Sequence, residues 1–75
     1  MTLKEVLKKF NNKNFDMIEY RGRNHINGKE KEYLVGFASY KDKMLISLDG
    51  DNYHLDDKIS EYELYKDNWL VVWYE

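Results

Sequence analysis

The feature that most constrains the fold is a run of six apolar residues, Trp69 to Tyr74, near the C-terminus. A run of this length, rich in Trp, Tyr and Val, is typical of a β-strand that is covered on both faces. Only one stretch of the chain has helical periodicity, and it is about three turns long. Because one short helix covers only one face of a sheet, the second face needs another cover: closure into a barrel, a partner, or a second copy of the chain.

The helix is expected at residues 2–11. Thr2 and Glu5 have the spacing of a capping box, in which each side chain bonds the backbone N–H of the other residue. The apolar residues that recur at helical spacing are Leu3, Val6, Leu7 and Phe10. The pair Asn11-Asn12 suits the end of a helix, so the sequence predicts one narrow apolar stripe.

After the helix the apolar pattern changes to the period of two that is typical of strands. Strands are expected at 14–21, 32–40, 44–48, 53–55, 60–65 and 69–74, with polar turns at Lys41-Asp42-Lys43, Asp49-Gly50-Asp51-Asn52 and Lys66-Asp67-Asn68. The alternation slips between Met17 and Ile18, which predicts a β-bulge or a strand that is partly covered on both faces. Residues 22–31 are polar and contain Asn27-Gly28, so they form a loop or the tip of a long hairpin. The strand at 32–40 is apolar on both faces and belongs in the centre of the sheet.

These elements predict an α+β fold in a single domain, residues 1–75. Its N-terminal helix packs on a strongly bent antiparallel sheet of about five strands, which could close into a small barrel. Apolar residues make up 43% of the chain, enough to predict a folded core despite the high content of charge. If the sheet stays open, its uncovered face is expected to meet a partner.

The sequence carries no signature of catalysis or metal binding. There is no cysteine, and His25 and His54 do not lie in a metal-ligand spacing. Asp49 and Asp51 begin a pattern like a calcium loop, but Tyr53 and His54 stand where that loop needs an oxygen ligand and a glycine. We therefore expect no cofactor, no metal and no enzymatic activity.

Charge is divided unevenly along the chain. Residues 1–32 contain eight Lys and Arg against five acids, and residues 33–75 contain four against nine. No apolar segment approaches the length of a membrane span or a signal peptide, so we expect a cytoplasmic protein without a membrane partner.

Each half of the chain suggests a different binding surface. The basic stretch could contact phosphates while Tyr20 and Tyr33 stack on bases, although a solvated hairpin also explains it. Its cations are Arg21, Arg23, His25, Lys29 and Lys31. The acidic stretch could imitate phosphates and occupy a basic groove of another protein, or form a solvated rim. Its acids are Asp49, Asp51, Asp56, Asp57, Glu61, Glu63 and Asp67. The net charge of -2 favours the acidic surface and disfavours nucleic acid.

A resemblance adds context to these patterns. Residues 46–63, which read ISLDGDNYHLDDKISEYE, and residues 69–75, which read WLVVWYE, are similar to small uncharacterised accessory proteins of phages and mobile elements in low-GC Gram-positive bacteria. The Thr-Leu-Lys-Glu opening of the helix also resembles that group. The resemblance implies a protein that acts in the cytoplasm of a bacterial host by binding a host or phage protein, for example as an inhibitor of a host defence nuclease. It carries no catalytic residue.

The leading hypothesis is thus a non-enzymatic binding module with an acidic and aromatic surface. The residues predicted to contact the partner are Asp49, Asp51, Asp56, Asp57, Tyr62 and Trp69. Two other hypotheses stay open: nucleic-acid association through residues 21–31, and a structural homo-oligomer built on Trp69 to Tyr74.

Overall fold

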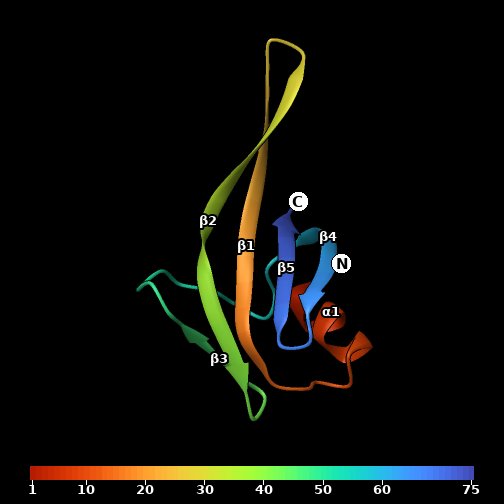
Figure 1. The fold of residues 1–75 in the computed structure, drawn as a ribbon, viewed down its shortest axis with the longest axis vertical. Helices are drawn as coiled ribbons and strands as arrows, with labels where there is room; N and C mark the ends of the chain where they lie inside the picture. The colour runs from red at the N-terminus through yellow and green to blue at the C-terminus, as the bar shows by residue number, and fades with distance from the viewer.

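The helix and most of the strands form where the local patterns predict them. The computed structural model describes residues 1–75 (Figure 1). Its elements are α1 (Leu3–Lys9), β1 (Phe15–Ile26), β2 (Lys29–Lys41), β3 (Met44–Ser47), β4 (Ile59–Lys66) and β5 (Trp69–Tyr74). One short helix and a five-stranded sheet confirm an α+β architecture that is mostly β. No helix is long and apolar enough to cross a membrane.

The sheet is open and mixed, in the order β3-β2-β1-β5-β4. Strands β1 and β5 run parallel, so the prediction of a wholly antiparallel sheet is wrong for this one pair. The edge strands β3 and β4 do not pair, so the sheet does not close and the barrel alternative is not supported. Parallel neighbours need a crossover connection. Residues 48–58 supply the crossing: they pass behind the sheet from the β3 edge toward the β4 edge (Figure 1).

Helix α1 has the predicted capping box. The Thr2 hydroxyl accepts the Glu5 backbone N–H at 3.3 Å, and the Glu5 carboxylate accepts the Thr2 backbone N–H at 3.0 Å. The next N–H groups, of Leu3 and Lys4, donate to the carbonyls of Asp57 and Leu55 at 2.9 Å each. These bonds satisfy donors that a helix N-terminus leaves free. The strand predicted at residues 53–55 is absent, because this backbone bonds the end of the helix and not a neighbouring strand.

Strands β1 and β2 form a long hairpin, which confirms one of the two alternatives predicted for residues 22–31. Residues 22–31 form its tip, with a two-residue turn in which Asn27 and Gly28 have φ angles of 53° and 75°. The bulge predicted near Met17 is present as a register shift between Phe15 and Ile18. Strand β5 pairs with β1 only from Met17 to Arg21, so the outer part of the hairpin projects as a two-stranded arm (Figure 1). Strand β1, and not β2, is the central strand.

The core lies between the sheet and the layer formed by α1 and residues 48–58. Eleven buried residues form it: Leu3, Val6, Leu7, Phe15, Ile18, Tyr20, Ala38, Tyr40, Ile59, Leu70 and Val72. Tyr53 extends this layer by stacking on Tyr20, with ring centroids 4.2 Å apart. A Cβ atom on Gly36 would lie 1.9 Å from the Asp49 carboxylate, so any larger residue there would have to displace the Asp49 side chain where the loop crosses β2. The helix and the loop thus cover one face of the sheet only.

Candidate functional site

The face of the sheet opposite α1 has no covering element, and we call it the open face. The side chains of strand β5 alternate between the helix side and the open face. Leu70 and Val72 point to the helix and are fully buried, whereas Trp69, Val71 and Trp73 point to the open face. Alternation and strand register add further open-face side chains: Met17, Glu19, Arg21 and Arg23 from β1; Glu32, Leu34 and Phe37 from β2; Glu61, Glu63 and Tyr65 from β4. The face therefore combines aromatic and charged residues from four strands.

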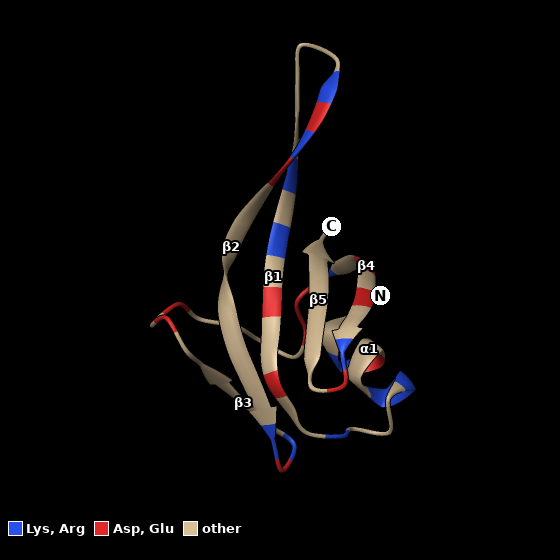
Figure 2. Ribbon diagram, in the orientation of Figure 1, with Lys and Arg blue, Asp and Glu red and all other residues tan.

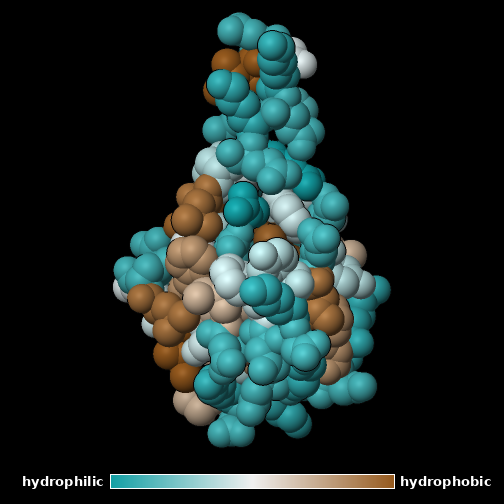
Figure 3. Space-filling model, viewed as in Figure 1, coloured by the Kyte–Doolittle hydropathy of each residue, from teal (hydrophilic) through white to brown (hydrophobic).

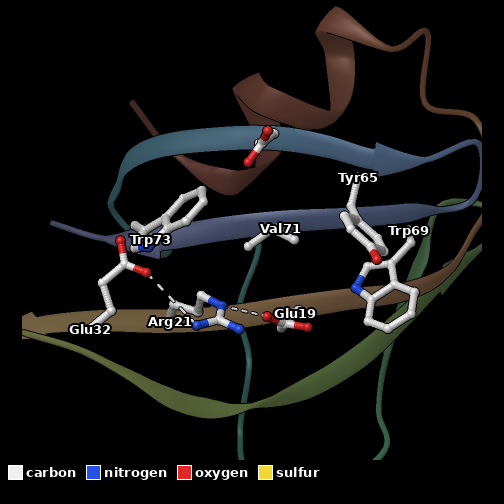
Figure 4. A pocket seen from close by; sticks show the side chains of 8 residues that line it. Glu19, Arg21, Glu32, Tyr65, Trp69, Val71 and Trp73 are labelled. Atoms are coloured by element: carbon white, nitrogen blue, oxygen red, sulfur yellow. Dashed lines mark hydrogen bonds and ion pairs between the residues drawn. The ribbon is translucent and has the colours of Figure 1, made fainter.

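A depression of about 400 Å³ lies on the open face along β5 (Figure 4). It is lined by Glu19, Arg21, Glu32, Glu63, Tyr65, Trp69, Val71 and Trp73. A second depression of about 290 Å³ is lined by Asp16, Met17, Lys66, Asn68 and Trp69. Trp69 contributes to both depressions and thus lies at their boundary. The larger one has the volume of a small-ligand cleft, roughly 300–1,000 Å³.

Tyr65 and Trp69 form the aromatic end of the larger depression. Their rings meet edge to face, with centroids 5.0 Å apart. Trp73 lies at the other end, beside Arg21 and Glu32 (Figure 4). Both tryptophans come from strand β5, which is paired with β1 on one side and with β4 on the other.

The charges of the open face form a connected network. Arg21 pairs with Glu19 and Glu32. Arg23 pairs with Glu30 at 3.0 Å and with Glu61 at 2.5 Å. The hydrogen bond that Arg23 donates to the Glu61 carboxylate is the main cause that raises the pKa of Arg23 above its ordinary value.

Arg23 also contacts an aromatic ring. Its guanidinium lies over the Trp73 ring, 5.0 Å from the centroid, which is a cation–π contact. Glu63, by contrast, lines the larger depression and takes part in no ion pair. The face therefore carries a carboxylate that its own arginines do not neutralise.

Two indole N–H groups on this face have no acceptor. The Nε1 atoms of Trp69 and Trp73 are buried and make no hydrogen bond, and the residue Trp73 as a whole is only 7% exposed. Figure 4 shows the Trp69 nitrogen on the side of the ring that faces the depression. Buried donors without partners are uncommon in folded proteins, and each calls for an explanation such as a bound acceptor.

An apolar strip extends the open face toward the β3 edge. Leu34, Met44 and Ile46 are 52%, 64% and 45% exposed. They lie opposite Arg21, Lys41 and Ser39 in the strand register. Figure 3, which looks onto the open face, shows apolar atoms gathered over β2 and β3.

The four predicted aspartates lie in the 48–58 loop, and none of them lines either depression. Asp49 organises this loop: its carboxylate accepts the N–H of Phe37 at 2.8 Å, the N–H of Asp51 at 2.9 Å and the hydroxyl of Tyr53 at 2.5 Å. Asp57 accepts the N–H of His54 at 2.9 Å. Asp51 and Asp56 are exposed. Contact of these aspartates with a partner stays a prediction.

The two predicted aromatic residues lie on opposite faces of the sheet. Tyr62 lies on the helix side, where its ring packs edge to face on Phe10 with ring centroids 5.9 Å apart. Trp69 lies on the open face. The structure therefore brings Trp69 together with residues that the predicted site omits: Glu19, Arg21, Glu32, Glu63, Tyr65, Val71 and Trp73. Alternation within 69–74 could have predicted that Trp69, Val71 and Trp73 share one face of the sheet and that Leu70 and Val72 lie on the other.

The hairpin arm places its cations among acids. Figure 2 shows the two signs alternating along the arm. Arg21 and Arg23 are in ion pairs, and His25, Lys29 and Lys31 are exposed. No group of three or more His, Asp or Glu side chains is placed to hold a metal ion.

Asp49 should make stability depend on pH in acid. The hydrogen bonds from Tyr53, Asp51 and Phe37 lower its pKa from 3.8 to about 2. Because the pKa of Asp49 is lower in the folded than in the unfolded chain, the ionised carboxylate stabilises the fold at pH values above the unfolded-state pKa. This contribution is lost as the pH falls from about 4 to about 2. We expect Asp49→Asn to melt at a lower temperature than the wild type at neutral pH, and the gap to narrow across that window. Thermal unfolding at stepped pH measures this, with Asp56→Asn as the control; a gap that stays constant would contradict it.

Comparison with protein families, curated proteins and solved structures finds no match for this chain.

Proposed function

We propose that this chain is a non-enzymatic binding module that docks a basic surface of another protein onto its open face. One observation carries the proposal: an uncovered sheet face holds a depression of about 400 Å³ with two tryptophans, a tyrosine and three glutamates in its lining. The chain would act as an accessory protein of the phage or mobile-element type, inhibiting a host protein by occupying its basic groove.

The composition of the open face supports protein binding. Trp, Tyr and Arg are the residue types most often found to dominate binding energy at protein interfaces. Here they sit on strands, so little conformational entropy is lost when they make contact. The apolar strip of Leu34, Met44 and Ile46 continues the same face and enlarges the area that a partner could bury.

The charge of the open face supports a basic protein over a nucleic acid. The open face carries Glu19, Glu30, Glu32, Glu61 and the unpaired Glu63 against Arg21, Arg23 and, beside Trp69, Lys66. An excess of carboxylates repels phosphates and attracts lysines and arginines, which steers encounter and selects the partner. If nucleic-acid bases stacked on the tryptophans, their phosphates would lie beside these glutamates and be repelled by them.

Affinity capture with charge-reversed baits tests the proposal. We expect Glu63→Lys to weaken capture of the partner from a low-GC Gram-positive lysate by about tenfold or more, since a like charge is placed against a basic surface. Glu75→Lys changes the net charge equally at an exposed residue outside the depression and should leave capture unchanged. A nuclease-treated parallel sample and mass spectrometry identify what is retained.

Two further outcomes would redirect the assignment. If Asp56→Lys abolishes capture and Glu63→Lys does not, the partner binds the loop aspartates and the open face is the wrong site. If retention disappears after nuclease treatment, the hairpin cations bind nucleic acid and the proposal fails. Sedimentation of the bait alone measures its oligomeric state and so shows whether the chain self-associates without a partner.

A further inference from the structure

We infer that the free edge of strand β3 pairs with the same edge of a second copy of the chain, so that two sheets join into one. Strand β3 pairs with β2 on one side and has no neighbour on the other. The inference goes beyond the proposed function, because no residue of β3 lines either depression. It is carried by a comparison of the two edge strands, β3 and β4.

Strand β4 is protected against pairing with another chain. Its register with β5 is irregular at two points, between Ile59 and Glu61 and between Leu64 and Lys66. The strand also carries three charged side chains, Glu61, Glu63 and Lys66. Bulges and charged side chains are devices by which natural proteins keep the edges of their sheets from pairing.

Strand β3 has neither form of protection. Its four residues, Met44 to Ser47, carry no charge, and its register with β2 has no shift. The side chains of Met44, Ile46 and Leu48 follow one another at alternate positions, and all three are exposed. A regular, uncharged edge with exposed apolar side chains is a template for another strand.

The backbone of β3 has hydrogen-bonding groups that point away from β2. The Leu48 N–H donates to the Phe37 carbonyl of β2 at 3.0 Å. Backbone groups point alternately to the two sides of a strand, so the N–H and C=O groups of Leu45 and Ser47 point outward. They bond no loop or turn. When Leu45 of one copy lies opposite Ser47 of the other in an antiparallel pair, the two residues exchange both N–H···O bonds.

The two ends of β3 carry charges of opposite sign. The turn before the strand contains two lysines against one aspartate, Lys41-Asp42-Lys43, and the loop after the strand begins with Asp49 and Asp51 (Figure 2). Lys43 is exposed and takes part in no ion pair. A strand with such ends attracts an antiparallel copy of itself, whereas a parallel copy would place like charges side by side.

The antiparallel register places Ile46 of both copies at a two-fold axis. Lys43 of each copy then lies opposite Asp49 of the other, and Met44 lies opposite Leu48. Each contact occurs twice, as a two-fold interface between identical surfaces requires. Because Ile46 meets Ile46 on the same side of the joined sheet, both open faces point in one direction. The dimer therefore presents two copies of the larger depression side by side, with β2 and β1 between each depression and the new seam.

Sedimentation equilibrium of the full chain from about 10 µM to about 1 mM tests the inference, since a short edge forms a small interface and a weak dimer. We expect a monomer–dimer equilibrium, weakened about tenfold or more in Ile46→Lys, because two like charges then meet at the axis. The matched control is Leu34→Lys, which makes the same charge change at an exposed apolar residue of β2 and should dimerise as the wild type does. Circular dichroism verifies that both variants are folded.

Amide hydrogen exchange locates the interface in the same samples. We expect the Leu45 and Ser47 amides to gain protection as the concentration of the wild type rises, and Ile46→Lys to lose it. A chain that stays monomeric up to about 1 mM would overturn the inference. A dimer in which these two amides exchange freely, or which Ile46→Lys leaves intact, would also overturn it and assign the contact to another surface, such as residues 69–74.

Discussion

Replacing Leu70 with alanine is expected to lower the free energy of unfolding by about 2–5 kcal/mol, because the change removes buried methyl groups and leaves a cavity. Leu70 is fully buried, pairs with Ile18 across the parallel strands and belongs to the cluster under α1. A domain of this size has a total stability of roughly 4–11 kcal/mol. The variant should therefore be close to unfolding at room temperature.

The matched control is Leu34→Ala, on the other face of the same sheet. Leu34 is 52% exposed, so its truncation should change stability by about 0.5 kcal/mol or less. Urea unfolding followed by tryptophan fluorescence measures both variants. If Leu34→Ala were as destabilising as Leu70→Ala, the open face would be covered in solution, and a dependence of the midpoint on protein concentration would identify a second copy as the cover.

Local signals in the sequence predicted local structure well. The capping box of Thr2 and Glu5, the Asn27-Gly28 turn and the bulge near Met17 are all confirmed, because each depends on residues close in the chain. The pairing of β1 with β5 could not be predicted in the same way. Periodicity shows that a segment is a strand but not which strand lies beside it or in which direction.

The candidate site was harder to predict than the fold, for two physical reasons. A carboxylate in a polar loop looks the same in sequence whether it faces solvent or accepts backbone N–H groups, and Asp49 does the latter. Conversely, Glu19 and Arg21 look like solvated residues on a strand, yet the structure places them beside two tryptophans. That one short helix leaves the second face of the sheet uncovered was predicted, but the sequence left open whether the sheet closes into a barrel, and the structure shows that it stays open.

Replacing Arg21 with methionine is expected to cause the second large loss of stability, and the role of Arg21 bears on the nucleic-acid alternative. Its guanidinium pairs with Glu19, whose side chain is only 10% exposed. Removing one partner of a buried pair costs about 3–5 kcal/mol, because the remaining charge is buried without compensation. Arg21 keeps 35% of its side-chain surface in solvent, so we expect a somewhat smaller loss of about 2–4 kcal/mol for Arg21→Met.

The double variant Glu19→Leu with Arg21→Met decides what Arg21 does. If Arg21 neutralises Glu19, removing both charges together should restore most of the stability lost in Arg21→Met, because apolar replacements of a buried pair are often neutral. Urea unfolding measures this recovery. If Arg21 instead served phosphates, the single variant would fold with nearly wild-type stability and lose salt-dependent retention on DNA or RNA. Recovery in the double variant would therefore assign Arg21 to the structure of the open face and remove it from the nucleic-acid alternative.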